Sequence, residues 1–217
     1  KRKLHRGGRL QMLAIKDRPK YNTSKKQRVG RKLECRWVDI PDPDPNGADE
    51  YPQAVYMQGR HAGGARFLGL EGGTFSKGSC YFTASDGGDA EQGQVWRYTP
   101  DNRDFGRGRL ELLYESPRNQ VVNGPDGIAV SPRGGILLCE DGDGEDVNGK
   151  DNWVRGLTPD GKLFTFAKVT EKLALHDHIA ADLFPFNKRR FDRPPRKGQG
   201  VGASETAGPG WSPDGRW

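Results

Sequence analysis

The sequence predicts an all-β protein that forms part of a β-propeller, and three observations support this prediction. Its apolar runs are short and end at Gly, Pro or Asp, as strands joined by turns do. Only 33% of the 217 residues are hydrophobic, whereas 31 are Gly and 15 are Pro, which favours a loop-rich fold with thin cores. Four apolar runs occur in order and then recur, and four strands in a repeat of roughly 40–50 residues are typical of a propeller blade.

Each repeat opens with an acidic residue followed by glycine. Glu71-Gly72 and Asp126-Gly127 are 55 residues apart, and each opens the run expected to be the innermost strand of a blade. Later positions of the two repeats match at offsets of 53 to 59 residues: Gly87 with Gly142, Thr99 with Thr158, and Leu110 with Leu163. A third unit begins at Glu205 and stops at Trp217. We therefore expect two clear blades and a partial blade after them.

The elements ahead of the first repeat are expected to form another partial blade. Residues 9–16 and 36–40 alternate between apolar and polar side chains and are predicted strands. Between them, residues 17–32 are polar and basic and are expected to form an excursion loop. Residues 41–47 contain three prolines and predict a rigid turn, and residues 54–65 show weak helical character.

The strands of the two clear blades follow from the apolar runs. They are expected within residues 71–75, 80–88, 94–100, 110–114, 126–130, 135–142, 153–159 and 163–166. Residues 143–152 resemble a calcium-binding EF-hand loop only superficially, because Asp146 stands where that loop turns on Gly and no Glu occupies its last position. A hairpin loop is the preferred interpretation.

Residues 168–203 carry no strand pattern and are expected to form a basic insertion loop. Two interpretations of residues 189–197 remain open, a solvated loop or a lid that contacts phosphate. His176 and His178 could share one face of a strand, but no partner ligand is placed by the sequence. We expect residues 1–217 to form one partial propeller domain, the C-terminal fragment of a longer protein.

Charge is divided unevenly along the chain. Residues 1–36 contain fourteen Lys and Arg against two acids, whereas residues 37–185 contain fourteen against twenty-four. The acidic repeats favour cations as ligands, and the basic ends lack the interleaved aromatics of single-strand binders, which disfavours nucleic acid. No apolar run is long enough to cross a membrane. Three cysteines without CxxC spacing disfavour a zinc site.

The recurring acids are the candidate functional residues. An acid at the start of each innermost strand would place Glu71, Asp126 and Glu205 in a ring around one end of the channel. Glu140 and Asp141, with Asp86, form a second set at the ends of the second strands. Like charges held close together need a neutralising partner, and carboxylates suit hard cations such as Ca²⁺. The alternative is that each acid–glycine pair makes a turn, in which Gly supplies a positive φ.

Several of these motifs together resemble the PhoX-type alkaline phosphatase family. The motifs are residues 66–73, 93–96, 124–135, 138–142, 156–161, 204–208 and 212–215. The Gly- and Asp-rich sequences of these motifs are most similar to the branch of the family often labelled as a domain of unknown function. The resemblance covers most of the chain from about residue 8 onward.

The resemblance implies a six-bladed propeller that is exported to the periplasm or secreted. It implies a phosphomonoester hydrolase with a cluster of Ca²⁺ and Fe³⁺ in the channel, and earlier blades that this chain does not contain. Glu71 resembles the metal-binding Glu of the family's Asp-Arg-Pro-Glu motif, and Asp126 and Glu205 resemble acids of later inner strands. The implied partner is a small phosphomonoester.

The chain departs from the family pattern in two respects. Gly69 stands where the family has an Arg that contacts phosphate, and no counterpart of the family's metal-binding Cys is present. Two functional hypotheses therefore remain open. One is a metal-dependent phosphatase, and the other is a non-catalytic propeller that binds calcium and acts as an interaction scaffold.

Overall fold

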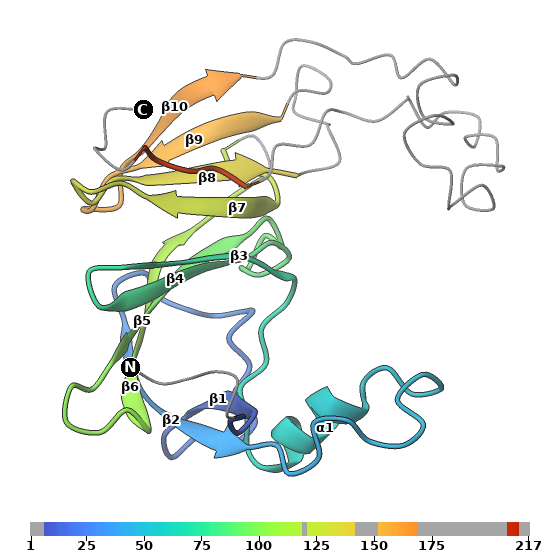
Figure 1. The fold of residues 1–217 in the computed structure, drawn as a ribbon. Coiled ribbons are helices and arrows are strands. Elements are labelled where there is room, and N and C mark those ends of the chain that lie inside the picture. Colours follow the sequence, from blue (N-terminus) through green and yellow to red (C-terminus); the bar gives the residue numbers. More distant parts are fainter. Residues whose placement is uncertain (1–6, 119–120, 142–151, 169–207, 213–217) are drawn as a thin grey trace, which may run out of the picture.

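The computed structural model describes residues 7–118, 121–141, 152–168 and 208–212. These residues form two antiparallel sheets and one helix (Figure 1). The strands are β1 (Gln11–Ile15), β2 (Lys32–Asp39), β3 (Leu70–Ser76), β4 (Ser79–Ala84), β5 (Gln94–Pro100), β6 (Arg107–Glu115), β7 (Pro125–Val130), β8 (Ile136–Glu140), β9 (Trp153–Leu157) and β10 (Leu163–Lys168). The helix is α1 (Ala54–His61), where weak helical character was expected.

Each repeat of the sequence forms a four-stranded meander. Strands β3 to β6 pair with their chain neighbours in order, and so do strands β7 to β10. The first strand of each meander, β3 or β7, lies at one edge of its sheet, and these two edges are neighbours (Figure 1). This is the arrangement of consecutive propeller blades, so the predicted partial propeller is confirmed.

The hairpin of β1 and β2 extends the first blade at its outer edge. Strand β2 pairs with β6, and the sheet order is β1-β2-β6-β5-β4-β3. Strand β2 begins four residues before the strand expected from the sequence. The reason is that Leu33 and Cys35 alternate with exposed Lys32 and Glu34, so the apolar pair is buried while the strand completes the ladder with β6.

One hydrophobic core lies inside the curl of the first sheet. Its buried residues are Leu13, Ile15, Leu33, Cys35, Ala65, Ala84, Trp96, Tyr98, Leu110 and Leu112. Phe67 packs edge-on against Phe82 and Trp96, with ring centroids 5.4 and 5.8 Å apart. The Trp37 indole N–H donates to the hydroxyl of Tyr98 over 2.8 Å, so the polar ends of these rings are satisfied.

A second core joins the two blades. Its buried residues are Val95, Ile128, Ile136, Leu138 and Leu157. Tyr81 and Leu113 of the first blade pack against it from the other face of their sheet. Because side chains alternate between the two faces of a strand, Trp96 serves the first core while its neighbour Val95 serves the second.

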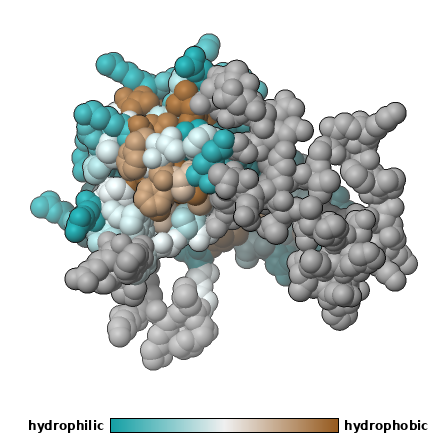
Figure 2. All heavy atoms as spheres, turned by 90° about the horizontal axis from the view of Figure 1, so that it is seen from above, coloured by the Kyte–Doolittle hydropathy of each residue, from teal (hydrophilic) through white to brown (hydrophobic). Residues whose placement is uncertain are grey.

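Both sheets also present apolar surface away from this shared core. An open hollow of about 590 Å³ in the first sheet is lined by aromatic side chains, among them Trp37, Phe67, Phe82 and Phe75, the last of which is 71% exposed. Seen from above, hydrophobic residues also gather on the second sheet's face that points away from the first (Figure 2). Phe164 of β10 is an exposed aromatic of the second sheet. No helix of the described residues is long and apolar enough to cross a membrane.

The thiol of Cys35 is expected to resist alkylation in the folded protein. Burial raises its pKa to about 12, so only about one thiol in ten thousand is ionised at pH 8. Cys80 is only partly buried, and burial raises its pKa as well. A short pulse of iodoacetamide followed by peptide mass spectrometry should label Cys80 ahead of Cys35, and guanidinium should abolish the difference. Equal labelling of the two thiols in the folded protein would contradict this prediction.

Candidate metal-binding cavity

Each acid–glycine pair of the repeat forms a β-bulge in an inner strand. The pairing of β3 with β4 shifts between Leu70 and Gly73, and the pairing of β7 with β8 shifts between Pro125 and Ile128. The two residues inside each shift are the acid and its glycine. Because both glycines lie within strands and neither has a positive φ, the alternative interpretation of the pair as a turn is wrong. A bulge redirects side chains and is common beside functional sites.

The glycine of each pair allows the next inner segment to pass closely. A Cβ on Gly72 would overlap the Asp126 carbonyl oxygen and lie 2.9 Å from the Ile128 nitrogen. In the same way, a Cβ on Gly127 would lie 2.6 Å from Cδ of Pro209. Backbone therefore packs on backbone at these points, and this contact places the acid of β3 beside the acid of β7.

Thr83 fastens the two inner strands together. Its side chain is fully buried, and its hydroxyl donates to the Asp126 carbonyl oxygen over 2.7 Å. The Gly72 carbonyl oxygen lies 3.4 Å from the same hydroxyl. The backbone of the β7 bulge is thus held by β4 of the neighbouring blade, and the position of the Asp126 carboxylate depends on both blades.

The two bulges open on one small cavity of about 140 Å³. Its lining residues are Glu71, Ser85, Asp86, Glu91, Gln92, Asn123, Gly124, Asp126 and Asp141. The structure therefore brings together Glu71 and Asp126 of the first expected set of acids with Asp86 and Asp141 of the second. Asp126 is half-buried, whereas Glu71, Asp86 and Asp141 are exposed, so the cavity is open to solvent.

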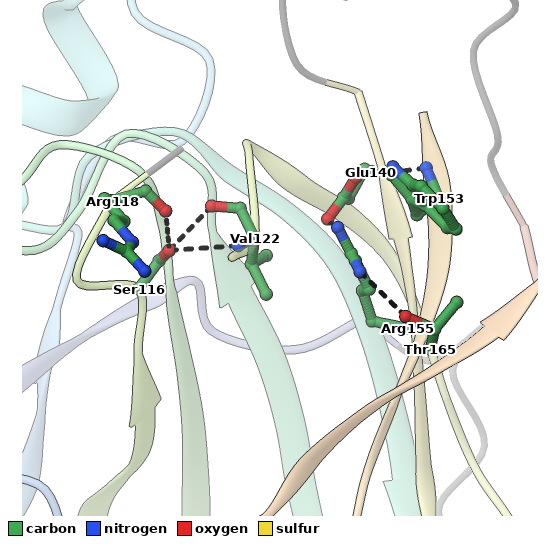
Figure 3. Close-up of polar contacts among 7 residues, drawn as sticks. All are labelled: Ser116, Arg118, Val122, Glu140, Trp153, Arg155 and Thr165. Atoms are coloured by element: carbon green, nitrogen blue, oxygen red, sulfur yellow. Dashed lines mark hydrogen bonds and ion pairs between the residues drawn. The ribbon is translucent and has the colours of Figure 1, made fainter. Parts of the chain in front are cut away.

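Glu140 forms a buried ion pair with Arg155 and does not line the cavity. Its side chain is buried, and its carboxylate accepts from Nε of Arg155 over 2.8 Å and from the Trp153 backbone N–H over 3.1 Å (Figure 3). Arg155 also donates to the hydroxyl of Thr165. Burial raises the pKa of Glu140, and the ion pair with Arg155 opposes that rise. Glu140 does not line the cavity, and it ties β8 to β9 directly beside Asp141.

The remaining expected residues cannot be placed. Glu205 lies outside the described residues, as do residues 169–203 of the basic insertion, its two histidines, and the loop 143–152 except Asn152. The segment 208–212 is described, and it approaches Gly127 of β7 as noted above.

The loop from Ser85 to Gly93 supplies cavity residues that the sequence did not single out. Glu91 lies there with a positive φ, and its carboxylate pairs with Lys25 of the β1–β2 connection. This pairing lowers the pKa of Glu91. Gln92 and Asn123 add amide groups to the wall. The repeat motif reaches only Asp86 and Gly87 at the start of this loop, so it did not identify Glu91 or Gln92.

A second loop brings Asn123 and Gly124 to the cavity from the other side. Ser116, which is fully buried, holds this loop (Figure 3). Its hydroxyl bonds to the carbonyl oxygens of Arg118 and Val122 at 2.9 and 2.7 Å. The Gly124 N–H then donates to the Gln92 carbonyl oxygen, and the Asp141 N–H donates to the Gly124 carbonyl oxygen. Three separate segments of the cavity wall are thereby joined by backbone hydrogen bonds.

The donor chemistry of the cavity fits a hard cation such as Ca²⁺. Its side chains offer carboxylate, amide and hydroxyl oxygens, which are the ligands that Ca²⁺ prefers. One of them, Oε1 of Gln92, is buried and has no hydrogen-bond partner among the described residues. Within the same part of the chain, no three Asp, Glu, His or Cys side chains converge closely enough to hold a metal by themselves. Cys35, Cys80 and Cys139 do not line the cavity.

Gly69 lies against Ser85 and Asp86 of the cavity wall and cannot be replaced by a larger residue without rearrangement. Its φ is +57°, which L-residues rarely adopt. A Cβ would overlap Oγ of Ser85 and lie 2.9 Å from Oδ2 of Asp86. The place that a Cβ would take at this position is therefore held by two residues of the cavity wall.

Comparison with known proteins gives two matches. The family model described as "Alkaline phosphatase PhoX" matches residues 1–217. Among solved structures, the chain is similar to Pseudomonas fluorescens PhoX in complex with vanadate, a transition state analogue, with 17% identity and a TM-score of 0.46. That match covers 71% of this chain and 34% of the other, so the chain spans about a third of the solved protein's length. No curated protein matches.

Proposed function

Because the chain belongs to the PhoX alkaline phosphatase family, as its motifs predicted, we propose that it forms part of a metal-dependent phosphomonoesterase. The observation that carries the proposal is the pair of bulges in β3 and β7, which directs two repeat acids to one cavity. We propose that Glu71, Asp126 and Asp141 each contribute a ligand to Ca²⁺ ions bound there, without all three converging on one ion, and that Asp86 lies beside them. Glu205 stays in the proposed set on the repeat pattern alone.

Each of these carboxylates would bind a cation through its negative charge, from a position that its backbone contacts hold. When bound, a cation at this site would polarise the phosphoryl oxygens of a phosphomonoester. Asp126 is held by the Thr83 hydrogen bond to its own carbonyl group, so its carboxylate starts from a fixed backbone. Asp141 is held by its N–H bond to Gly124 and by the buried Glu140–Arg155 pair next to it. Preorganisation of this kind lowers the cost of assembling the site.

The iron of the implied cluster would take its cysteine ligand from outside this cavity, since none of the three cysteines of the chain lines it. We also propose, from the family resemblance, that the whole protein is periplasmic or secreted. Its further blades would cover the apolar hollow that contains Phe67 and Phe75, since each blade of a propeller buries its faces against its neighbours.

Replacing Glu71 with Gln in the full-length protein is expected to reduce both bound calcium and hydrolysis of p-nitrophenyl phosphate. The substitution removes a ligand charge without changing side-chain size. We expect the rate to fall by about 100-fold or more, because loss of a partner that only supports a metal ligand already costs about 10–100-fold. Elemental analysis and the hydrolysis assay should be made on the same samples, and Asp126→Asn should behave alike.

Glu50→Gln is the matched control, because Glu50 is an exposed glutamate outside the cavity. Its metal content and rate should stay within about twofold of the unsubstituted protein, as surface changes usually do. Normal calcium content and normal turnover in Glu71→Gln would contradict the proposal.

The second candidate function is a calcium-binding scaffold without turnover, and the geometry at Gly69 favours it. The arginine that the family resemblance places there would supply positive charge to a phosphate, and Ser85 and Asp86 hold the place that its Cβ would need. Bound calcium with no hydrolysis in the unsubstituted full-length protein would select this function over the phosphatase.

A further inference from the structure

Gln92 is the cavity residue with an unsatisfied polar atom. Oε1 of this side chain is buried and accepts no hydrogen bond from the described residues, while the residue lines the cavity with Glu71, Asp126 and Asp141. A buried acceptor without a donor costs about 1–3 kcal/mol, and such groups are rare in folded proteins. An oxygen in this condition, in a wall of carboxylates, is suited to accept a cation.

The backbone at Gln92 is fixed on both sides. Its carbonyl oxygen accepts from the Gly124 N–H over 3.3 Å, and the next residue, Gly93, accepts from the Ser116 N–H over 2.9 Å. A Cβ on Gly93 would overlap the ring of Pro125, the first residue of β7. The loop is therefore pressed against the start of the strand that carries Asp126, and Gln92 is held at the cavity.

The charge balance of the cavity favours a neutral ligand at this position. Glu91 is already paired with Lys25, whereas four further carboxylates border the same small space. No three of the described acids converge closely enough to hold a cation alone, so a cation bound here would need neutral oxygens among its ligands as well. Ca²⁺ takes six to eight oxygen ligands and accepts Gln and Asn carbonyl oxygens among them.

We propose that the Gln92 side chain is a direct oxygen ligand of the Ca²⁺ bound in this cavity. The inference rests on the proposed metal site and extends it to a residue that lies in no repeat motif. It also accounts for the buried Oε1, which the cation would satisfy. No role in proton transfer is assigned to Gln92, because its amide group does not titrate.

Gln92→Leu in the full-length protein is expected to weaken Ca²⁺ binding by about 10- to 100-fold, as loss of a supporting group at a metal site does. Isothermal titration with Ca²⁺ alone measures this directly, without reference to turnover. The rise in melting temperature on adding Ca²⁺ should shrink as well. The metal-free variant should melt at the same temperature as the unsubstituted protein or higher, because the leucine leaves no unpaired oxygen in the wall.

Two further variants sharpen the test. Gln92→Glu keeps an oxygen at the same place and should bind Ca²⁺ more tightly than Gln92→Leu does. Gln53→Leu changes an exposed glutamine outside the cavity and should leave the affinity unchanged.

The outcomes separate this inference from the proposed function. If the unsubstituted protein binds Ca²⁺ and Gln92→Leu binds it equally well, the inference is wrong and the metal site stands. If the unsubstituted protein binds no Ca²⁺, both are wrong. Weakened binding in Gln92→Leu that Gln92→Glu restores would establish the ligand.

Discussion

Replacing Arg155 with Met is expected to destabilise the folded protein by about 3–5 kcal/mol at neutral pH, the cost of leaving a buried charge without its partner. The Glu140 carboxylate is 2–3% exposed, and the Arg155 side chain is only 12% exposed. The guanidinium of Arg155 also lies over the Trp153 ring, with Cζ 4.7 Å from the ring centroid. Met keeps a similar aliphatic stem, so the loss would come from the charge and its contacts. Urea unfolding followed by circular dichroism measures the effect.

The penalty in Arg155→Met should grow as pH rises. Burial already raises the pKa of Glu140 in the folded protein, and removal of Arg155 removes the main influence that opposes this rise. A carboxyl group whose folded pKa exceeds its unfolded value binds its proton more tightly when folded, so stability is lost as pH rises from the unfolded pKa through the folded one. The variant should therefore lose more stability relative to the unsubstituted protein at pH 8 than at pH 5.

Lys162→Met is the matched control for this prediction. Lys162 pairs with Asp160 in the same blade, but both side chains are largely exposed, and such pairs contribute about 0–1 kcal/mol. The double variant Glu140→Met, Arg155→Met should recover much of the stability, since apolar pairs often replace buried ion pairs without loss. Equal effects of Arg155→Met and Lys162→Met would contradict the assigned role of the buried pair.

Gly72→Val is expected to destabilise the protein by about 3 kcal/mol, the upper end of the usual cost of overpacking. The new side chain would overlap backbone of β7 rather than the flexible end of a side chain, so the two inner strands would have to separate. Because Glu71 and Asp126 reach the cavity from these strands, the variant should also bind Ca²⁺ more weakly. Thermal unfolding and calcium titration on the same sample check both results.

Gly73→Val is the control for Gly72→Val. Gly73 is the next residue of the same strand, but the nearest atom to its added Cβ is the Tyr81 carbonyl oxygen at 3.9 Å. Both substitutions replace Gly with a β-branched residue that suits strands, so local propensity is matched. Equal stability losses at the two positions would show that the close approach of β3 and β7 is not the cause.

The acid–glycine repeat shows what the local sequence pattern could predict and what it could not. Spacing alone identified Glu71-Gly72 and Asp126-Gly127 as equivalent. Each blade repeats the same strand order, and its inner strand needs a glycine where the next inner segment approaches closely. The alternative of a turn was rejected only by the sheet register, which places both pairs in bulges. A glycine needed for close packing looks the same in a sequence as a glycine needed for a positive φ.

The sequence by itself determined the family, the all-β class and the order of strands in two blades, because these depend on short apolar runs and their recurrence along the chain. Tertiary structure alone decided which acids share the cavity. Glu140 and Asp141 are neighbours in sequence, but one joins Arg155 in the interior and the other lines the cavity wall. Glu140 is the last residue of β8, and its pairing with β7 and β9 directs its side chain to the interior, whereas Asp141 follows the strand. Tertiary structure also decided that Gln92 lines the cavity, because the position of a loop depends on the strands and segments it contacts and not on its own sequence pattern.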